Sequence, residues 1–131
     1  MSYVAELKTK NILIVGGGTT GKSLANYLDS LGAEFDIFDE KDSTIAGIET
    51  LTDISDYSIY DLAIVSPGWR LDHLVITNLK SNGVEIISEI DFAWMLKSEI
   101  NPDQTWLAVT GTNGKTTTIQ MLESILIAAG V

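Results

Sequence analysis

The residues with the clearest chemistry form a glycine-rich loop near the carboxyl end, at positions 109–118. An apolar run at 106–109 precedes the loop, and a helical pattern from Ile119 to Ala129 follows it. A strand, a glycine loop and a helix in this order direct several backbone N–H groups and the positive end of a helix dipole toward one point. The loop therefore predicts a phosphate-binding site, although a tight strand-to-helix turn without a ligand has the same order of elements.

Two side chains of this loop strengthen the phosphate interpretation. The loop reads G-x-x-G-K-T from Gly111, and it departs from the standard Walker spacing because position 109 is a valine. Lys115 adds a full positive charge at the start of the helix, and Thr116 lies where a hydroxyl can hold Mg²⁺.

A second glycine turn lies near the amino end. The apolar run 11–15 predicts a strand that is buried on both faces, as in a parallel sheet. Gly16, Gly18 and Gly21 then match G-x-G-x-x-G, and a helix with Leu24, Tyr27, Leu28 and Leu31 on one stripe is expected to end at Gly32. A second strand closes on Asp39, where dinucleotide-type folds carry an acidic residue. The glycines could instead serve only the turn and the close packing of helix on strand.

The middle of the chain continues the alternation of strands and helices. Residues 61–65 predict a buried strand that ends in a Ser-Pro-Gly turn, which is either a ligand contact or an ordinary turn. An amphipathic helix marked by Leu71, Leu74, Val75 and Leu79 follows, and a strand at 84–87 comes next. Ser88 and Asp91 resemble a capping box for a short helix that carries Ile90, Ala93, Trp94 and Leu96. The single histidine, His73, is expected on the surface of the earlier helix. Residues 40–60 allow a short strand or a helical turn near 48–54.

These patterns predict an α/β protein with two parts. Residues 1–98 are expected to form a Rossmann-like parallel-sheet domain, and the polar stretch 98–104, which contains Pro102, is expected to be a linker. Residues 99–131 then form the first βα unit of a P-loop ATPase domain. The last helix is apolar on nearly all sides, so we expect either that the chain is a fragment of a larger protein or that this unit docks on the first sheet.

Composition excludes several classes of protein. The chain has 131 residues, no cysteine and a formal net charge of −10, which argues against nucleic-acid binding and excludes disulfides and thiolate chemistry. The start of the chain does not resemble a signal peptide, and no apolar run approaches the ~20 residues of a membrane span. We therefore expect a cytoplasmic protein without membrane insertion.

The loop Thr110-Gly111-Thr112-Asn113-Gly114-Lys115-Thr116-Thr117 resembles the ATP-binding loop of the Mur ligase superfamily. Within that superfamily, the glycine turn near the amino end, the Asn113 of the loop and the Ser-Pro-Gly turn are similar to the D-glutamate-adding ligases. Members that add L-alanine usually carry histidine where this chain has Asn113. The resemblance covers essentially the whole chain, but only about the first third of such an enzyme.

The resemblance implies a role for each motif. Gly18, Thr19, Thr20 and Gly21 would lie against the diphosphate of UDP-N-acetylmuramoyl-L-alanine. Asp39, Glu40 and Lys41 would lie near the uridine, and Ser66, Pro67 and Gly68 would lie on the uracil side. ATP would be held by Gly111, Thr112, Asn113, Gly114, Lys115, Thr116 and Thr117, with Lys115 as the catalytic residue and Thr116 as the Mg²⁺ ligand.

The implied reaction is the ATP-dependent addition of D-glutamate to UDP-N-acetylmuramoyl-L-alanine through an acyl phosphate, in peptidoglycan precursor synthesis. We expect the full-length enzyme to be monomeric and this chain alone to be inactive, because the D-glutamate site would lie beyond residue 131. Two alternatives remain open: an NAD-binding Rossmann module, which does not explain Lys115, and another ligase of the superfamily, such as an L-alanine-adding enzyme.

Overall fold

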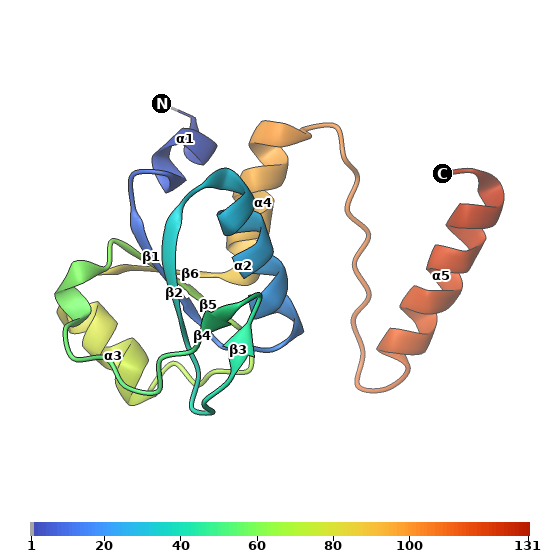
Figure 1. Ribbon diagram of the computed structural model, residues 1–131. Coiled ribbons are helices and arrows are strands. Elements are labelled where there is room, and N and C mark those ends of the chain that lie inside the picture. The colour runs from blue at the N-terminus through green and yellow to red at the C-terminus, as the bar shows by residue number, and fades with distance from the viewer. Residues whose placement is uncertain (1) are drawn as a thin grey trace.

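A computed structural model describes residues 2–131, and its centre is a four-stranded parallel sheet (Figure 1). The strand order is β2-β1-β5-β6. The bounds are β1 (Asn11–Val15), β2 (Glu34–Phe38), β5 (Leu62–Val65) and β6 (Glu85–Ser88). The sheet confirms the expected Rossmann-like α/β fold.

β1 is the central strand, and its sequence reflects burial on both faces. It pairs in parallel with β2 on one side and with β5 on the other. Side chains alternate between the two faces of a strand, so Ile12 and Ile14 enter one apolar cluster while Leu13 and Val15 enter the other. All four are buried. This double burial explains the uninterrupted apolar run, because neither face of the strand meets water.

Helices cover both faces of the sheet (Figure 1). The cluster that contains Ile12 and Ile14 is completed by α1 (Tyr3–Leu7), α2 (Thr19–Leu31) and α4 (Glu89–Ile100). The opposite cluster is completed by α3 (Leu74–Ser81) and the 3₁₀ turn η1 (Tyr57–Ile59). The sequence patterns did not reveal α1, although its Leu7 is fully buried.

Residues 40–60 form a small hairpin, after which the chain returns to the edge of the sheet. β3 (Thr44–Ile45) and β4 (Ile48–Glu49) pair antiparallel across Ala46 and Gly47, which both have positive φ. Leu51 then makes a parallel bridge with Phe38 at the end of β2. The short strand near residue 48 is one of the two possibilities that the sequence allowed, whereas the hairpin was not expected.

The structure confirms two expected helix ends, the end of α2 at Gly32 and the start of α4 at Ser88. Gly32 ends α2 in the left-handed conformation, with φ 69°. At the start of α4 the Ser88 hydroxyl accepts from the Asp91 N–H at 3.1 Å, and an Asp91 carboxylate oxygen lies 3.4 Å from the Ser88 nitrogen. The expected capping box is therefore present.

Three details of the expected helices are wrong. α3 begins only at Leu74, and both Leu71 and Leu74 are 69% exposed. His73 is the residue that caps α3, not part of its surface. In α4 the buried residue is Phe92, whereas Ile90 and Trp94 are more than half exposed. In each case tertiary contacts, rather than the local pattern, decide which side chains face the core.

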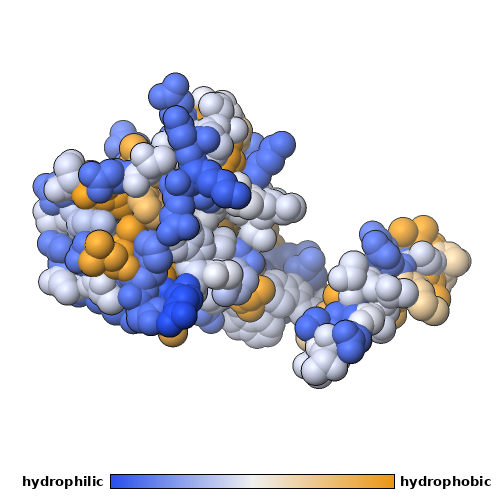
Figure 2. Space-filling model, turned by 90° about the horizontal axis from the view of Figure 1, so that it is seen from below, coloured by the Kyte–Doolittle hydropathy of each residue, from blue (hydrophilic) through white to orange (hydrophobic). Residues whose placement is uncertain are grey.

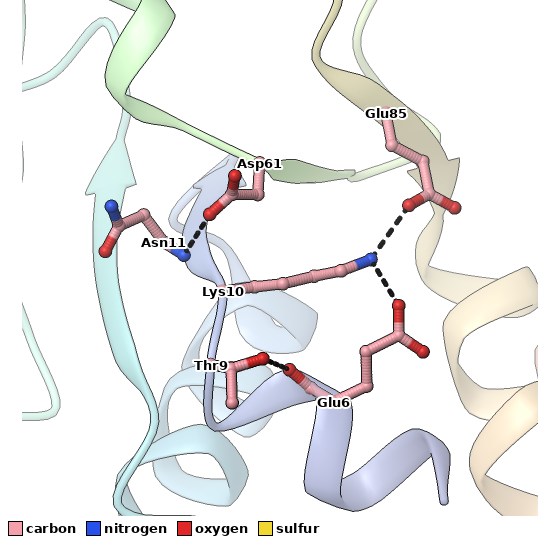
Figure 3. Close-up of polar contacts among 6 residues, drawn as sticks. All are labelled: Glu6, Thr9, Lys10, Asn11, Asp61 and Glu85. Atoms are coloured by element: carbon pink, nitrogen blue, oxygen red, sulfur yellow. Dashed lines mark hydrogen bonds and ion pairs between the residues drawn. The ribbon is translucent and has the colours of Figure 1, made fainter. Parts of the chain in front are cut away.

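The amino-terminal edge of the sheet is joined by polar contacts (Figure 3). Lys10 Nζ lies 3.0 Å from a carboxylate oxygen of Glu6 and 3.0 Å from one of Glu85. Burial lowers the pKa of Lys10, but its hydrogen bonds with Glu6 and Glu85 outweigh that effect and raise it overall. The Asn11 N–H donates to Asp61 Oδ2 at 2.8 Å. These contacts connect α1 to β6, and β1 to the residue before β5.

The carboxyl-terminal residues stand apart from the sheet (Figure 1). α5 (Lys115–Ala129) has no buried residue, and Figure 2 shows apolar surface gathered on it. The strand expected at 106–109 is absent, because this extended segment has no neighbouring strand to pair with among residues 2–131. Trp106 does reach the first part of the molecule, packing edge-on against Trp94 at 5.4 Å. No helix among the described residues is long and apolar enough to cross a membrane.

We predict that hydrogen exchange separates the two parts of the chain. An isolated helix of about 15 residues is only marginally stable in water, and α5 has no buried side chain to stabilise it. Amides of residues 105–129 should exchange far faster than those of β1 and β5 in a monomer, measured by mass spectrometry. Protection of residues 105–129 equal to that of β1 would contradict this expectation.

A second prediction concerns the contact of α2 with the turn after β1. A Cβ atom on Gly21 would collide with the backbone oxygen of Gly16. Gly21→Ala should therefore destabilise the protein by about 1–3 kcal/mol in chemical denaturation, because a backbone atom cannot move aside cheaply. Gly68→Ala is the matched control, since no atom lies within 4 Å of its added Cβ. Its effect should stay within about 0.5 kcal/mol, and equal effects of the two substitutions would argue against close packing at Gly21.

Candidate functional site

A cavity of about 340 Å³ opens at the carboxyl-terminal edge of the sheet, and we call it the glycine-turn cavity. Seven of the substrate-site residues that the family resemblance implied line it: Gly18, Thr19, Thr20, Asp39, Ser66, Pro67 and Gly68. They come from three different loops. The structure therefore brings the two turns and the acidic residue together at one cavity.

Parallel strand pairing creates this convergence. The turns after β1, β2 and β5 all leave the same edge of the sheet, because these strands run in the same direction. Hydrogen bonds continue the pairing into the turns. Gly16 N donates to Phe38 O at 2.8 Å, and Ser66 N donates to Val15 O at 3.0 Å. The two turns are thus held at fixed positions against the end of β1.

The start of α2 supplies backbone donors to the cavity. Gly18 caps the helix without any side-chain hydrogen bond, and a Cβ atom on Gly18 would have nothing within 4 Å. The first N–H groups of an α-helix have no partner within the helix, and the helix dipole makes this end partially positive. Gly18, Thr19 and Thr20 therefore present backbone N–H groups and open space to an anionic group.

Asp39 lines the cavity while it also holds the glycine turn. Its Oδ2 accepts from Gly17 N at 2.7 Å, and its Oδ1 accepts from Lys41 N at 3.1 Å. The carboxylate thus fixes the turn after β1 to the turn after β2. Its negative charge also makes this side of the cavity unfavourable for an anion.

Three residues expected at the site lie elsewhere. Gly21 does not line the cavity, because it packs under the Gly16 carbonyl. Glu40 lines a neighbouring cavity of about 380 Å³, which we call the His73 cavity. There its Oε1 lies 3.1 Å from His73 Nε2. Lys41 lines neither cavity.

The sequence analysis missed two side chains in the glycine-turn cavity, Trp69 and Glu89. Trp69 is the residue directly after the Ser-Pro-Gly turn, so its position next to a suspected ligand contact was a usable signal. Glu89 is the first residue of α4, and its Oε2 lies 3.4 Å from the Ser66 hydroxyl. Nothing in the sequence indicated that the start of α4 would approach the turn after β5.

Two glycines shape the backbone of the second glycine loop, which the sequence predicts to bind phosphate. Gly111 and Gly114 both have positive φ, 154° and 77°, and Gly114 caps α5 without a side-chain hydrogen bond. Lys115 Nζ donates to the Gly111 carbonyl at 2.7 Å, so the ammonium lies across the loop. Gly111, Thr112, Asn113, Gly114, Lys115, Thr116 and Thr117 are all exposed, and none lines the glycine-turn cavity.

The loop hydroxyls differ in their availability for a metal ion. Thr118 Oγ1 donates to the Gly114 carbonyl at 2.7 Å, whereas Thr116 makes no side-chain hydrogen bond within residues 2–131. One hydroxyl together with phosphate oxygens and water suits Mg²⁺, which is seldom bound by protein groups alone. Across the described part of the chain, no group of three or more His, Cys, Asp or Glu side chains could hold a metal ion. The residues present therefore fit a Mg²⁺ ion that arrives with a bound phosphate.

Comparisons with known proteins identify the family of the chain. Residues 10–88 match the family model described as "Mur ligase MurD-like, N-terminal domain". A search of solved structures finds the crystal structure of RSP, a Rex-family repressor, at 17% identity and a TM-score of 0.43. That match covers 71% of this chain and 59% of the repressor, a likeness too low to bear on function.

Curated relatives match nearly the whole chain. The UDP-N-acetylmuramoylalanine–D-glutamate ligase of Nocardia farcinica is 37% identical over 95% of this chain and 28% of its own length. The ligases of the same name from Corynebacterium efficiens and Thermobifida fusca are 33% and 34% identical, covering 91% and 95% of this chain and 27% and 29% of their own lengths. This chain thus spans less than a third of the length of these relatives. Because the family model covers more than half of its residues, the chain belongs to the MurD-like family of Mur ligases.

Proposed function

We propose that this chain carries the substrate-nucleotide site and the ATP loop of a ligase that adds D-glutamate to UDP-N-acetylmuramoyl-L-alanine. The observation that carries the proposal is the presence of two separate glycine turns, each opening a helix whose first N–H groups lack a side-chain cap. A single nucleotide-binding module needs only one such turn. The matches to D-glutamate ligases run across both turns and support the same assignment.

In this proposal the glycine-turn cavity holds the UDP part of the substrate. The free N–H groups of Gly18, Thr19 and Thr20 would bind the diphosphate, with the positive end of α2 behind them. Gly21 acts indirectly, since its lack of a side chain lets the helix approach the turn. The wider match to the family supports placing Ser66, Pro67 and Gly68 on the uracil side.

The carboxylates at the cavity decide the orientation of the ligand. Asp39 and Glu89 both line it, and each would repel a phosphate but accept a hydrogen bond from a neutral donor. The diphosphate is therefore expected at the amides of α2, with the ribose and the base toward the carboxylates. Glu40 and Lys41 would act next to Asp39, at the outer side of the uridine.

The second loop would hold ATP. Gly111, Thr112, Asn113, Gly114 and Thr117 would surround the phosphates, Lys115 would neutralise the β- and γ-phosphates, and Thr116 would ligate Mg²⁺. Bound ATP would transfer its γ-phosphoryl group to the substrate carboxylate, giving an acyl phosphate and ADP. The amine of D-glutamate would then attack the acyl carbon, and the amide would form as phosphate leaves. The loop residues contribute position and charge, which are what phosphoryl transfer mainly requires.

Calorimetric titration of this chain tests the first site. UDP-N-acetylmuramoyl-L-alanine should bind saturably, and NADH should not, because the proposal assigns the cavity to a UDP ligand. Saturable binding of NADH alone would instead favour a dinucleotide-binding module.

Gly18→Asp provides a matched variant for this titration. Aspartate is a good helix cap and should preserve or increase stability, and its Cβ has room. Its carboxylate would occupy the N–H groups of α2 and repel the diphosphate. The variant should therefore unfold no earlier than the original chain but lose ligand binding, and full retention of binding would place the diphosphate elsewhere.

The ATP loop is tested in a ligase that carries it at full length. Lys115→Ala should lower kcat by at least about 10²–10³-fold, the effect of losing one donor to the transition state. Lys80→Ala, which removes an exposed lysine on α3, is the control and should leave kcat unchanged. Near-normal turnover of Lys115→Ala would exclude the proposed role.

A further inference from the structure

Trp69 has a fixed place at the wall of the glycine-turn cavity. It follows the Ser-Pro-Gly turn, and its backbone N–H donates to the Ser66 carbonyl at 3.1 Å. Its indole lines the cavity together with the two turns and Glu89. The side chain is half-buried, so it offers aromatic surface to a ligand without being free to move into solvent.

Two aromatic rings, those of Phe38 and His73, contact the indole of Trp69. Phe38, the last residue of β2, meets it edge-on with ring centres 5.6 Å apart. His73 meets it nearly perpendicularly, with ring centres 4.7 Å apart and an interplanar angle of 86°. Edge-to-face contacts of this kind stabilise aromatic pairs beyond their buried area.

His73 is itself fixed at both ring nitrogens. The backbone N–H of Val75 donates to Nδ1 at 3.3 Å, so the proton of the neutral ring lies on Nε2, which is 3.1 Å from Glu40 Oε1. The imidazole therefore has one orientation, set by the start of α3 on one side and by the turn after β2 on the other. This orientation in turn limits the positions open to the indole.

The indole N–H edge lies directly over the glycine turn. A Cβ atom placed on Gly16 would lie 2.7 Å from Trp69 Nε1, so only glycine allows this approach. Within residues 2–131, Trp69 Nε1 makes no hydrogen bond. The ring and its donor thus face the region between the turn after β1 and the turn after β5.

The charges around the cavity favour a neutral group in this region. Anions are favoured at the uncapped start of α2, whereas Asp39 and Glu89 disfavour them on the remaining wall. A nucleotide with its diphosphate on the amides of α2 must therefore direct its base toward the wall that contains Trp69. Aromatic side chains and bases stack through their ring faces, whatever the identity of the base.

We propose that Trp69 is a substrate-binding residue that packs its indole against the pyrimidine base of the substrate, and that His73 is the positioning residue that holds the indole. This inference rests on the proposed function, because it assumes a UDP ligand in the glycine-turn cavity. It adds two residues that neither the glycine motif nor the Ser-Pro-Gly turn includes.

The test uses UDP as the probe and calorimetry as the measurement. Trp69→Ala should weaken UDP binding by roughly 5- to 150-fold, the range found when a base loses an aromatic partner. Trp69→Phe, which keeps an aromatic ring, should retain most of the affinity. Trp94→Ala removes an exposed tryptophan that does not line the cavity and should leave the affinity unchanged.

Fluorescence provides an independent readout. With Trp94→Phe and Trp106→Phe together, Trp69 is the only tryptophan left in the chain. Saturating UDP should then change its emission with the same midpoint as the calorimetric titration. UDP binding without any change in Trp69 emission would overturn the inference.

A double-mutant cycle separates the role of His73 from a general effect on folding. His73→Asn keeps a side chain that caps α3 but removes the ring that contacts Trp69. It should weaken UDP binding in the original chain and add nothing in the Trp69→Ala background, with an unchanged unfolding midpoint. Fully additive effects would mean that His73 does not act through Trp69.

The outcomes distinguish this inference from the function on which it rests. If UDP binds the original chain and Trp69→Ala equally well, the role of Trp69 is overturned while the proposed function stands. If Trp69→Phe binds as weakly as Trp69→Ala, ring packing is overturned. If the original chain shows no saturable UDP binding, the proposed function fails, and the inference fails with it.

Discussion

The parallel pairing of β1 with a strand on each side is the constraint on which the rest of the structure depends. β1 hydrogen-bonds to β2 and β5 along its whole length, so the turns that follow all three strands emerge at one edge of the sheet. Two turns and an acidic residue that lie as far apart in the sequence as Gly18 and Gly68 line one cavity there. The same pairing requires helices on both faces, because a central strand of the composition of β1 cannot leave either face in water.

The cavity at this edge has two chemically different walls. One wall consists of backbone N–H groups at the uncapped start of α2, and the other carries the carboxylates of Asp39 and Glu89. This contrast is what makes an acidic protein compatible with a phosphate-containing ligand. The chain has a formal net charge of −10 and no lysine lines the cavity, so an anion there would be held by backbone N–H groups and the dipole of α2. Trp69 completes the carboxylate wall, and the Phe38 and His73 rings hold it there.

The carboxyl-terminal unit is shaped by local interactions rather than by long-range packing. Its loop has a local geometry set by two glycines with positive φ and by the bond from Lys115 to the Gly111 carbonyl. These are short-range interactions, so they form without a surrounding sheet. The segment at 106–109 and the apolar side chains of α5 need long-range partners, and among the described residues they have almost none. A glycine loop can thus keep its local geometry while the elements on either side of it remain unburied.

Features that depend on neighbouring residues could be predicted from the amino-acid sequence. The four strands of the sheet, the end of α2 at Gly32, the capping box at Ser88 and the family of the chain could all be inferred, because periodicity, caps and glycine spacing act within a few residues. Only the tertiary structure decided which side chains meet. Phe92 rather than Trp94 fills the core, His73 caps a helix and holds Trp69, and Glu89 approaches Ser66 from another element. These outcomes depend on the direction in which each element faces its neighbours, and that direction is set by packing between residues that are distant in the chain.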